Sequence, residues 1–379
     1  MPPWRPLEHD TQCQFLVIGA GFAGLAVARE LERRGADVLT VDADAPGAGA
    51  STRNAGFVLL THPWDYPEVR RRIGRDGTRA LLSLARRTHQ IIEQDHGAAV
   101  GHRRCGSLML EDEDGPFGPG TLDEAAVMLS DDGVATEWTT APAGTLGFGR
   151  ALLIPDDGEV HPGALVASLA ARLNRVALAT VTSLDAHARV AFAGALTLRF
   201  EHVIVCTNAW TERLLPGARG LITPQRAQVL VTAPVPHALE RPCYSTGGYD
   251  YFRQRADGAL VLGGRRHLHR ASEATDDPRP TDGVQTDLER FIAASLPFAA
   301  GAAIKRRWAG LMGFTPDDLP LVGPLPSAPE HASVLAGWNG HGVGLALGCA
   351  ERLADALGGG PRTPEMLDPA RFPTMLDAR

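Results

Sequence analysis

The stretch Phe15-Leu-Val-Ile-Gly-Ala-Gly-Phe-Ala-Gly24 decides the fold of this chain. An apolar run ends at Ile18, glycines at 19, 21 and 24 form a Gly-x-Gly-x-x-Gly pattern, and the amphipathic run 22–34 follows, closed by Gly35. This order predicts a strand, a tight turn and a helix. The helix N-terminus favours a phosphate, and the glycines serve the turn, the approach of a pyrophosphate and the contact between helix and strand. We therefore expect an α/β chain with a Rossmann-like dinucleotide-binding domain.

A second strand and its terminal acid extend this pattern. The apolar run 38–41 ends in Asp42, where a carboxylate accepts hydrogen bonds from ribose hydroxyls and repels the 2′-phosphate of NADP. The fingerprint alone does not distinguish NAD from FAD. The following run of small residues, Gly47-Ala-Gly-Ala-Ser-Thr-Arg-Asn-Ala-Gly56, favours FAD, because a ribitol chain and a flavin edge could approach its backbone closely.

A second glycine-rich loop stands near the C-terminus, Gly337-Trp-Asn-Gly-His-Gly-Val-Gly344. It opens the helical apolar pattern 345–357, so backbone N–H groups and the positive end of a helix point at one place. Negative charge develops near N1 and the C2 carbonyl of a flavin on reduction, and a preorganised helix N-terminus stabilises it. Two such loops, far apart in the chain, imply one long cofactor.

Further motifs continue along the chain: Gly158-Glu-Val-His-Pro-Gly163, Val203-Ile-Val-Cys-Thr-Asn-Ala-Trp210, Asp257-Gly-Ala-Leu-Val-Leu-Gly-Gly264 and Arg307-Trp-Ala-Gly-Leu-Met-Gly-Phe-Thr-Pro-Asp-Asp-Leu-Pro-Leu-Val-Gly323. Together with the segments above, they make nearly the whole chain resemble the D-amino-acid-oxidase-like FAD-dependent oxidoreductases, the group that includes glycine oxidase and sarcosine oxidase. The resemblance implies an FAD-dependent oxidase or dehydrogenase for amines or amino acids.

The chain divides into two predicted domains. Residues 12–62, 155–220 and 303–379 are expected to form a discontinuous FAD-binding domain, in which 202–206 is a buried parallel strand. Residues 63–154 and 221–302 contain short strand-like segments, which suggest a mixed β-sheet. They are expected to form a substrate domain inserted over the flavin, as the resemblance also implies, with the site between the two domains.

Except for Val181, the residues expected to bind FAD fall in these motifs. They are Gly19, Gly21, Phe22, Ala23, Gly24, Asp42, Ser51, Thr52, Arg53, Asn54, Ala55, Gly56, Val181, Thr207, Asn208, Trp210, Gly310, Gly340, His341, Gly342, Val343 and Gly344. Some flavoenzymes of this group hold FAD covalently through histidine or cysteine. This chain has Asn54 where that histidine would be and no cysteine in 307–317, so we expect non-covalent FAD, with His62 as the remaining alternative.

The candidates for substrate contact or catalysis are His341, Tyr249, Tyr251, Met312, Arg226 and Arg253. His341 could be a base, although hydrogen bonding to the cofactor is the more ordinary role. Tyr249 and Tyr251 would share one face of a strand. In glycine-oxidase-like relatives an arginine that grips the α-carboxylate of the substrate stands where this chain has Met312. A thioether cannot do this, so the expected substrate is an amine, or an acid whose more distant carboxylate meets Arg226 or Arg253.

The reaction expected from this resemblance is removal of a hydride from a C–N bond of an amine, imino acid or amino acid. The resulting imine would then be hydrolysed by water, and O2 or another acceptor would take the electrons. One alternative is a 2-hydroxy-acid dehydrogenase on the same fold. Another is a non-catalytic or electron-transfer flavin subunit of a larger complex.

Composition restricts the remaining possibilities. The chain has 379 residues, enough for two domains, with 44% hydrophobic residues and a net charge of −7 that offers no general basic surface for nucleic acid. Five scattered cysteines without a CxxC pair indicate a reducing, cytoplasmic setting. No membrane span, metal-ligand cluster or Gly-x-Ser-x-Gly motif occurs in the sequence.

Overall fold

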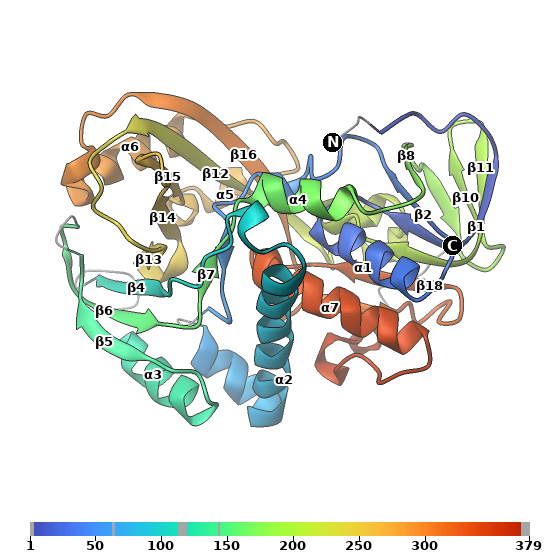
Figure 1. Cartoon of the computed structure of the whole chain (residues 1–379), viewed down its shortest axis with the longest axis horizontal. Helices are drawn as coiled ribbons and strands as arrows, with labels where there is room; N and C mark the ends of the chain where they lie inside the picture. Colours follow the sequence, from blue (N-terminus) through green and yellow to red (C-terminus); the bar gives the residue numbers. More distant parts are fainter. Residues whose placement is uncertain (1–3, 63–64, 113–119, 143–144, 373–379) are drawn as a thin grey trace.

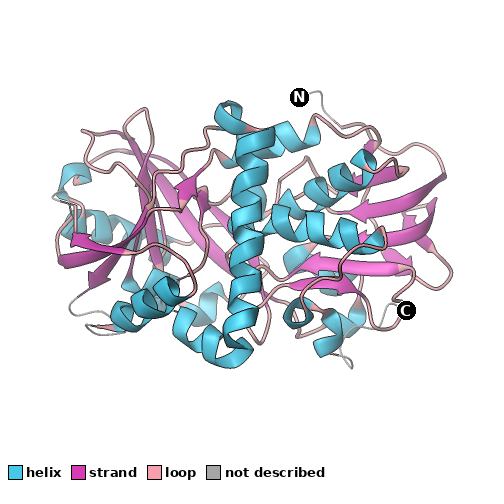
Figure 2. Cartoon of the chain, turned by 60° about the horizontal axis from the view of Figure 1, so that its bottom comes forward, coloured by secondary structure: helices cyan, strands magenta, loops and turns pink. Residues whose placement is uncertain are grey.

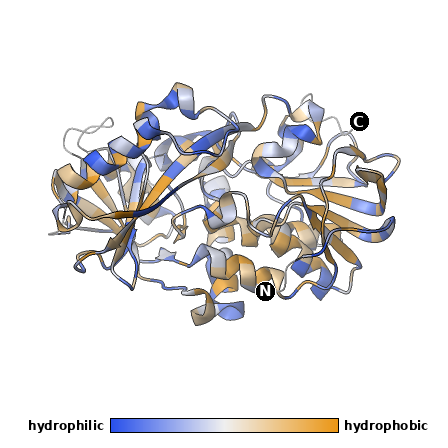
Figure 3. Ribbon diagram, turned by 90° about the horizontal axis from the view of Figure 1, so that it is seen from above, coloured by the Kyte–Doolittle hydropathy of each residue, from blue (hydrophilic) through white to orange (hydrophobic). Residues whose placement is uncertain are grey.

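Two large β-sheets lie side by side in the computed structural model, which describes residues 4–62, 65–112, 120–142 and 145–372. The long helix α2 (Tyr66–Asp95) runs between them, with strands on both sides (Figure 1, Figure 2). Apolar segments are frequent along the strands of the sheets, and hydrophilic segments lie on the outer loops and on the peripheral helices (Figure 3). None of the helices in the described part of the chain is both long and apolar enough to cross a bilayer.

The first sheet has the expected parallel core. Its central order is β17-β18-β11-β1-β2-β8, in which the neighbours from β18 to β8 run parallel and β17 is antiparallel. The strands are β1 (Thr11–Ile18), β2 (Val38–Asp42), β8 (Val176–Leu178), β11 (Leu196–Val205), β17 (Leu321–Pro324) and β18 (Ala332–Ala336). In addition, β10 (Val190–Ala193) pairs with β11, and β9 (Ser183–Asp185) pairs with β10. The predicted buried parallel strand at 202–206 is confirmed as the end of β11.

Three helices contribute to the core on one face of this sheet: α1 (Phe22–Arg33), α4 (Pro162–Ala170) and α7 (Gly342–Leu357). The predicted helix after the first glycine turn is therefore confirmed. Helix α2 packs on α7 at Gly348, where a Cβ atom would lie 2.2 Å from the carbonyl oxygen of Leu84. The N–H of Gly348 also donates a hydrogen bond to Thr88 Oγ1 at 3.0 Å. Glycine thus lets the two helices touch backbone to backbone.

The second sheet is mixed, as predicted. Its order is β16-β12-β15-β14-β13-β4-β6-β5, with β13 and β4 parallel and the other neighbours antiparallel. The strands are β4 (Ser107–Asp112), β5 (Glu137–Thr140), β6 (Phe148–Ile154), β12 (Thr223–Pro234), β13 (Cys243–Ser245), β14 (Asp250–Gln254), β15 (Ala259–Gly263) and β16 (Ile304–Phe314). Helix α6 (Asp282–Ser295) packs on one face, with short α5 (Arg270–Glu273) beside it, and α3 (Thr121–Asp131) lies over the opposite side of β4 and β6.

The structure differs from the predicted domain division at two elements. Strand β16 belongs to 303–379 but pairs along its length with β12 of the second sheet. Helix α2 belongs to 63–154 but packs partly on α7 of the first unit. The sequence pattern of a strand shows that one face is apolar and does not show which strand will be its neighbour. The division at the other boundaries remains a prediction.

A buried aspartate, Asp157, forms hydrogen bonds in the segment that connects the two sheets. Asp157 follows β6 and precedes β7 (Gly158–Glu159), which pairs with β3 (Phe57–Val58). Its Oδ1 accepts a hydrogen bond from the N–H of Leu60 at 2.8 Å, and its Oδ2 accepts one from Ser107. Asp157 is fully buried, and burial raises the pKa of its carboxyl to about 7.

This carboxyl makes the stability of the protein depend on pH. An unfolded aspartate titrates near ~3.9. The folded protein therefore binds this proton more tightly, and its contribution to the free energy of unfolding falls as the pH rises from about 4 to about 7. The amide of Asp157→Asn can still accept from Leu60 and removes the titration. We expect the melting temperature of the variant, relative to wild type, to be higher at about pH 8 than at about pH 5. An equal difference at both pH values would contradict this assignment.

Candidate active site

The first glycine loop has the geometry of a cradle. Gly19 has φ of +112°, and a Cβ atom at Gly24 would lie 1.8 Å from the carbonyl oxygen of Gly19, so neither position has room for a side chain. Gly21 is different, because a Cβ atom there would meet only Ser51 Oγ, at 3.0 Å. The protein itself therefore leaves space over Gly21, at the N-terminus of α1. Phe22 and Ala23, in the first turn of α1, are buried in the core and can offer only backbone to this space.

Asp42 and Ser51 hold this loop in place. Asp42 accepts a hydrogen bond from the N–H of Ala20 at 2.6 Å through Oδ2 and one from Asp44 at 3.0 Å through Oδ1. Ser51 Oγ accepts from the N–H of Phe22 at 2.9 Å. Each carboxylate oxygen of Asp42 has a second lone pair, so it can also accept from a ribose hydroxyl.

The 50–56 segment is braced internally and against β16. Asn54 donates to the carbonyl oxygens of residues 50 and 51 and accepts from the N–H of Gly56 at 2.8 Å. Arg53 donates to the carbonyl oxygen of Ala309 at 3.0 Å, and its own carbonyl oxygen accepts from Trp308 Nε1 at 2.9 Å. Thr52 donates to the carbonyl oxygen of residue 47, and Ala55 is buried. Gly310 faces Arg53, since its Cβ atom would lie 3.1 Å from the Cβ of Arg53. This segment thus connects the two sheets.

The other predicted cofactor residues after β11 lie near the same loops. Asn208 has φ of +44° and accepts from the N–H of Gly337 at 3.1 Å, which links β11 to the second glycine loop. The ring of Trp210 lies 3.3 Å from where a Cβ of Gly49 would be. Thr207 donates to Thr211, on the first turn after the strand. Val181, in contrast, packs against the core on the β9–β10 side of the first sheet, and no described contact joins it to Asp42.

The second glycine loop opens helix α7 beside the second sheet. A Cβ at Gly344 would lie 2.2 Å from the carbonyl oxygen of Leu59, and one at Gly340 would lie 3.6 Å from Met312 Sδ. Gly342 packs against Trp338, and Val343 is buried in the core. In the first turn of α7 the N–H of Gly344 donates to the carbonyl oxygen of His341 at 3.1 Å, whereas those of Gly342 and Val343 have no partner within the helix and can meet a developing negative charge.

His341 precedes this helix and stays neutral. Its ring centroid lies 5.1 Å from that of His62, and burial, together with the nearby His62, lowers the pKa of His341 to about 4. His62 lies 2.8 Å from Asp65 Oδ2 through Nδ1. Although burial opposes it, this hydrogen bond lowers the pKa of Asp65. The sequence analysis considered His62 as a residue near the cofactor, but no pattern indicated that Asp65 is its partner.

One face of the second sheet remains half-exposed next to α7. In the register of β12 and β16, Gln225 stands opposite Met312, and both side chains are half-buried. Their neighbours Arg226 and Leu311 point to the other face and are buried. Side chains alternate along a strand, so the open face carries a further set of half-buried residues, Ala227, Phe314, Tyr244 and Tyr251. The second sheet thus presents accessible side chains on the side where Met312 approaches the glycine loop.

The two candidate tyrosines do not share a strand face, which corrects the prediction. Tyr251 lies on β14, near Phe57 and Tyr244, with ring centroids 6.2 and 5.9 Å away. Tyr249 precedes β14, in a helical conformation after the 3₁₀ turn Thr246–Gly248, and its ring lies 5.0 Å from that of His267. The glycine-containing turn breaks the two-residue period that the sequence suggested. Burial raises the pKa of Tyr251 to about 12, so its phenol stays protonated.

Arg226 cannot bind a substrate carboxylate, in contrast to the prediction. Its side chain is buried against Glu273, with a bidentate ion pair at 2.7 and 3.0 Å. Its remaining donors meet the carbonyl oxygens of residues 272, 277 and 279 at 2.9 to 3.2 Å. All five N–H groups of the guanidinium are therefore used. The register of β12 explains this role, because it turns Arg226 toward α5 and away from Met312.

Arg253 is also neutralised, although it lies on the side of β14 that faces the 50–56 segment. Its Nη1 lies 3.0 Å from Glu159 Oε2, and its Nη2 donates to the carbonyl oxygen of Val160 at 3.2 Å. Nη2 also lies 3.1 Å from where a Cβ of Gly56 would be. Arg253 therefore supports the back of the small-residue segment, and its charge is held by Glu159.

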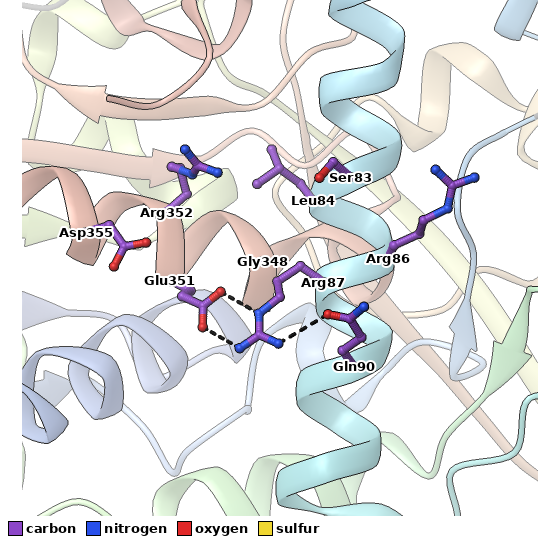
Figure 4. A pocket seen from close by; sticks show the side chains of 9 residues that line it. All are labelled: Ser83, Leu84, Arg86, Arg87, Gln90, Gly348, Glu351, Arg352 and Asp355. Carbon is purple, nitrogen blue, oxygen red and sulfur yellow. Dashed lines mark hydrogen bonds and ion pairs between the residues drawn. The ribbon is translucent and has the colours of Figure 1, made fainter. Parts of the chain in front are cut away.

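A hollow lined by α2 and α7 lies apart from these residues (Figure 4). Arg87 holds Glu351 through two hydrogen bonds, at 2.6 and 2.7 Å, and contacts Gln90 at 3.2 Å. None of the residues predicted for cofactor or substrate lines it. Within the described ranges, no group of three or more His, Cys, Asp or Glu side chains could hold a metal ion.

Comparison with known proteins gives consistent relationships. A family model described as FAD dependent oxidoreductase matches residues 14–356. Glycine oxidase of Pseudomonas aeruginosa is 26% identical over 390 residues, covering 94% of this chain and 97% of that protein. The 4-methylaminobutanoate oxidase (formaldehyde-forming) of Paenarthrobacter nicotinovorans is 27% identical over 392 residues, covering 92% of this chain but only 44% of that protein. The crystal structure of glycine oxidase from Geobacillus kaustophilus has a TM-score of 0.78 at 19% identity, covers 94% of this chain and 98% of that one, and shows the shared fold.

Proposed function

Because the chain belongs to the family of FAD-dependent oxidoreductases, we propose that it oxidises a C–N bond of an amine or amino-acid substrate and releases an imine that water hydrolyses. The observation that carries this proposal is the pairing of the α7 N-terminus with the half-exposed face of the second sheet, through Gly340 and Met312. This arrangement supports the binding of cofactor and substrate between the N-terminus of α7, which stabilises negative charge, and a face of accessible side chains on the second sheet.

The residues present fit the cofactor. The space over Gly21 and the free lone pairs of Asp42 suit a pyrophosphate and a ribose, and the N-terminus of α7 suits the flavin edge. When bound, FAD accepts a hydride from the substrate carbon next to nitrogen. Dissociable FAD is part of the proposal, since Asn54 is engaged in bracing its own loop. So is a reducing, cytoplasmic setting, which agrees with five free cysteines.

The protein contributes mainly alignment and exclusion of water. A neutral amine supplies its own nitrogen lone pair to assist hydride departure, so a strong general base is unnecessary. His341, which stays neutral, can accept or donate a hydrogen bond without placing a positive charge beside the amine. The rings of Phe57, Tyr244 and Tyr251 lie close together and can form an apolar wall of the proposed site. The phenol of Tyr251 stays protonated, so it adds no charge to this wall.

Met312 and two relatives support the proposed substrate class. The glycine oxidase relative is named for a small amino acid, and the other relative is named for 4-methylaminobutanoate, whose carboxylate is remote from nitrogen. In this chain a thioether and no guanidinium stands at position 312, beside Gly340. A carboxylate adjacent to the oxidised carbon would find no fork-shaped partner there. We therefore place simple α-amino acids among the poor substrates.

Product analysis tests this function. The purified holoenzyme is incubated with N-methylated amines, N-methyl amino acids of increasing chain length, glycine, D-alanine and 2-hydroxy acids. The expected products are an aldehyde and the demethylated or free amine, with glycine and D-alanine converted at least about tenfold more slowly than the best amine. Formation of a 2-oxo acid from a hydroxy acid alone would establish the rival dehydrogenase. Turnover of glycine as fast as the best amine would contradict the role of Met312.

A further inference from the structure

One arginine next to the half-exposed sheet face has no acidic partner. Arg266 follows β15 in the 3₁₀ turn Arg266–Leu268, and its side chain is half-buried. In the described part of the chain, no carboxylate lies within ion-pair distance of its guanidinium. The acid that acts on it from farther away is Glu273, which Arg226 already holds. Burial lowers the pKa of Arg266, although a guanidinium remains charged.

Three other arginines of this region have acidic partners, which Arg266 lacks among the described residues. Arg226 is paired with Glu273 and Arg253 with Glu159. Arg265, directly before Arg266 in the chain, lies 3.4 Å from Asp250 and over the ring of Phe291. Charges taken out of water are as a rule paired, because an unpaired one is costly. Arg266 is the exception in this group.

The surroundings of Arg266 hold its guanidinium in a defined position. It lies 5.0 Å from the ring centre of Phe314 and 5.4 Å from that of Tyr249, and it donates a hydrogen bond to Gln225 Oε1. Aromatic faces and a side-chain amide fix a guanidinium without cancelling its charge. Two of these partners, Gln225 and Phe314, belong to the half-exposed face that carries Met312.

A second arginine, Arg270, whose side chain is exposed, contacts the same tyrosine. The guanidinium of Arg270 lies 5.6 Å from the ring centre of Tyr249 and donates to its hydroxyl oxygen at 3.1 Å. No ion pair of Arg270 with a described acid accompanies this contact. Two guanidinium groups around one tyrosine repel each other, and an anion between them would relieve that repulsion.

We propose that Arg266 and Arg270, held around Tyr249, bind a carboxylate that the substrate carries at the end remote from its oxidised carbon. This inference rests on the proposed amine-oxidising function and names the acid class within it. The five donors of Arg266 include a free pair suited to a planar carboxylate, since the contact with Gln225 uses one of them. In this proposal Arg266 binds the remote carboxylate, a role for which the sequence analysis had suggested Arg226 or Arg253.

The position of Arg266 sets the approximate length of that substrate. Gln225, its anchor, is paired with Met312, and paired residues on antiparallel strands are about 5 Å apart. The residue that anchors Arg266 is therefore about one strand spacing, roughly 5 Å, from Met312. About four carbon–carbon bonds of roughly 1.5 Å in a zigzag chain span this distance. The matching acids carry the carboxylate several carbons from the nitrogen.

Binding of simple carboxylates tests the site without any turnover. The holoenzyme is titrated with butanoate and pentanoate, and with butanamide and pentanamide, by calorimetry and by the change in flavin absorbance. Wild type should bind the carboxylates at least about tenfold more tightly than the amides, as expected for a charge-assisted bond. Arg266→Gln should raise the dissociation constant of the carboxylates about 10- to 100-fold and leave that of the amides unchanged. Arg266→Lys should fall between the two, because it keeps the charge and loses the fork.

Arg199→Gln is the matched control, because it removes one positive charge from an exposed arginine on β11 of the first sheet, whereas Arg266 follows β15 of the second sheet. It should bind carboxylates as wild type does. Equal carboxylate affinity in Arg266→Gln and wild type would overturn the proposal. So would an equal loss in Arg199→Gln, which would mean a general charge effect, or a parallel loss of amide binding, which would mean a structural role. If carboxylates bind through Arg266 but no amine reduces the flavin, the proposed amine-oxidising function is refuted and the carboxylate site is not.

Discussion

Gly21→Val should remove FAD from the protein without unfolding it. The backbone at Gly21 is extended, with φ of −78° and ψ of −176°, so valine can adopt it without strain. Its Cβ would meet only Ser51 Oγ, at the cost of about 1 kcal/mol if that hydroxyl gives up its bond to Phe22. The side chain would instead fill the space proposed for the pyrophosphate. We expect FAD content below about a tenth of wild type, equivalent to a loss of at least ~1.4 kcal/mol of binding.

The measurement is the FAD that appears in the supernatant after acid precipitation, together with the melting temperature of the apoprotein. Gly24→Ala is the contrasting variant, because its Cβ would lie 1.8 Å from the carbonyl oxygen of Gly19 and must displace backbone. It should lower the melting temperature of the apoprotein itself, whereas Gly21→Val should not. Normal FAD occupancy in Gly21→Val would reject the cradle. Wild-type flavin that stays with the precipitate would reject dissociable binding and direct attention to His62.

Arg226→Met should strongly destabilise the protein while leaving its FAD site intact. Removal of this guanidinium leaves Glu273 as a buried carboxylate with one side-chain donor, Gln228 Nε2 at 2.9 Å. Removal of one partner of a buried ion pair lowers the free energy of unfolding by about 3 to 5 kcal/mol. Urea unfolding of the apoprotein should show a loss of this order.

The double variant Arg226→Met with Glu273→Gln should recover part of that stability, because it removes the orphaned charge. FAD content of the folded fraction should equal that of wild type in both. A stable Arg226→Met protein that has lost only its affinity for acidic substrates would restore the role that the sequence suggested for this arginine.

The secondary structure around the proposed cofactor loops could be predicted from the sequence, because its features are local. A strand, three spaced glycines and a helix are encoded within one short stretch, and the space at Gly21 contrasts with the tight contact at Gly24 as the fingerprint implies. The second glycine loop is equally local. It predicts the N-terminus of α7, and the structure adds its neighbours, among them Met312 and Leu59.

The substrate side depends on register and pairing, which no short pattern contains. Gln225 and Arg226 are adjacent in sequence, and only the alignment of β12 with β16 decides that the first faces Met312 and the second faces Glu273. Arg265 and Arg266 form a similar pair, of which one meets Asp250 and the other does not. An arginine without a partner can be recognised only when all possible partners are placed in space.

The central claim, oxidation of a C–N bond by bound FAD, is tested most directly by anaerobic spectroscopy of the isolated holoprotein. The oxidised flavin absorbance is recorded during addition of N-methyl amino acids, amines and 2-hydroxy acids, and an electron acceptor is then admitted. The account predicts that the absorbance is bleached by an amine, most readily by one with a remote carboxylate, and that it returns with the acceptor. A protein that carries FAD whose absorbance none of the amines bleaches, or which only a hydroxy acid bleaches, would contradict it.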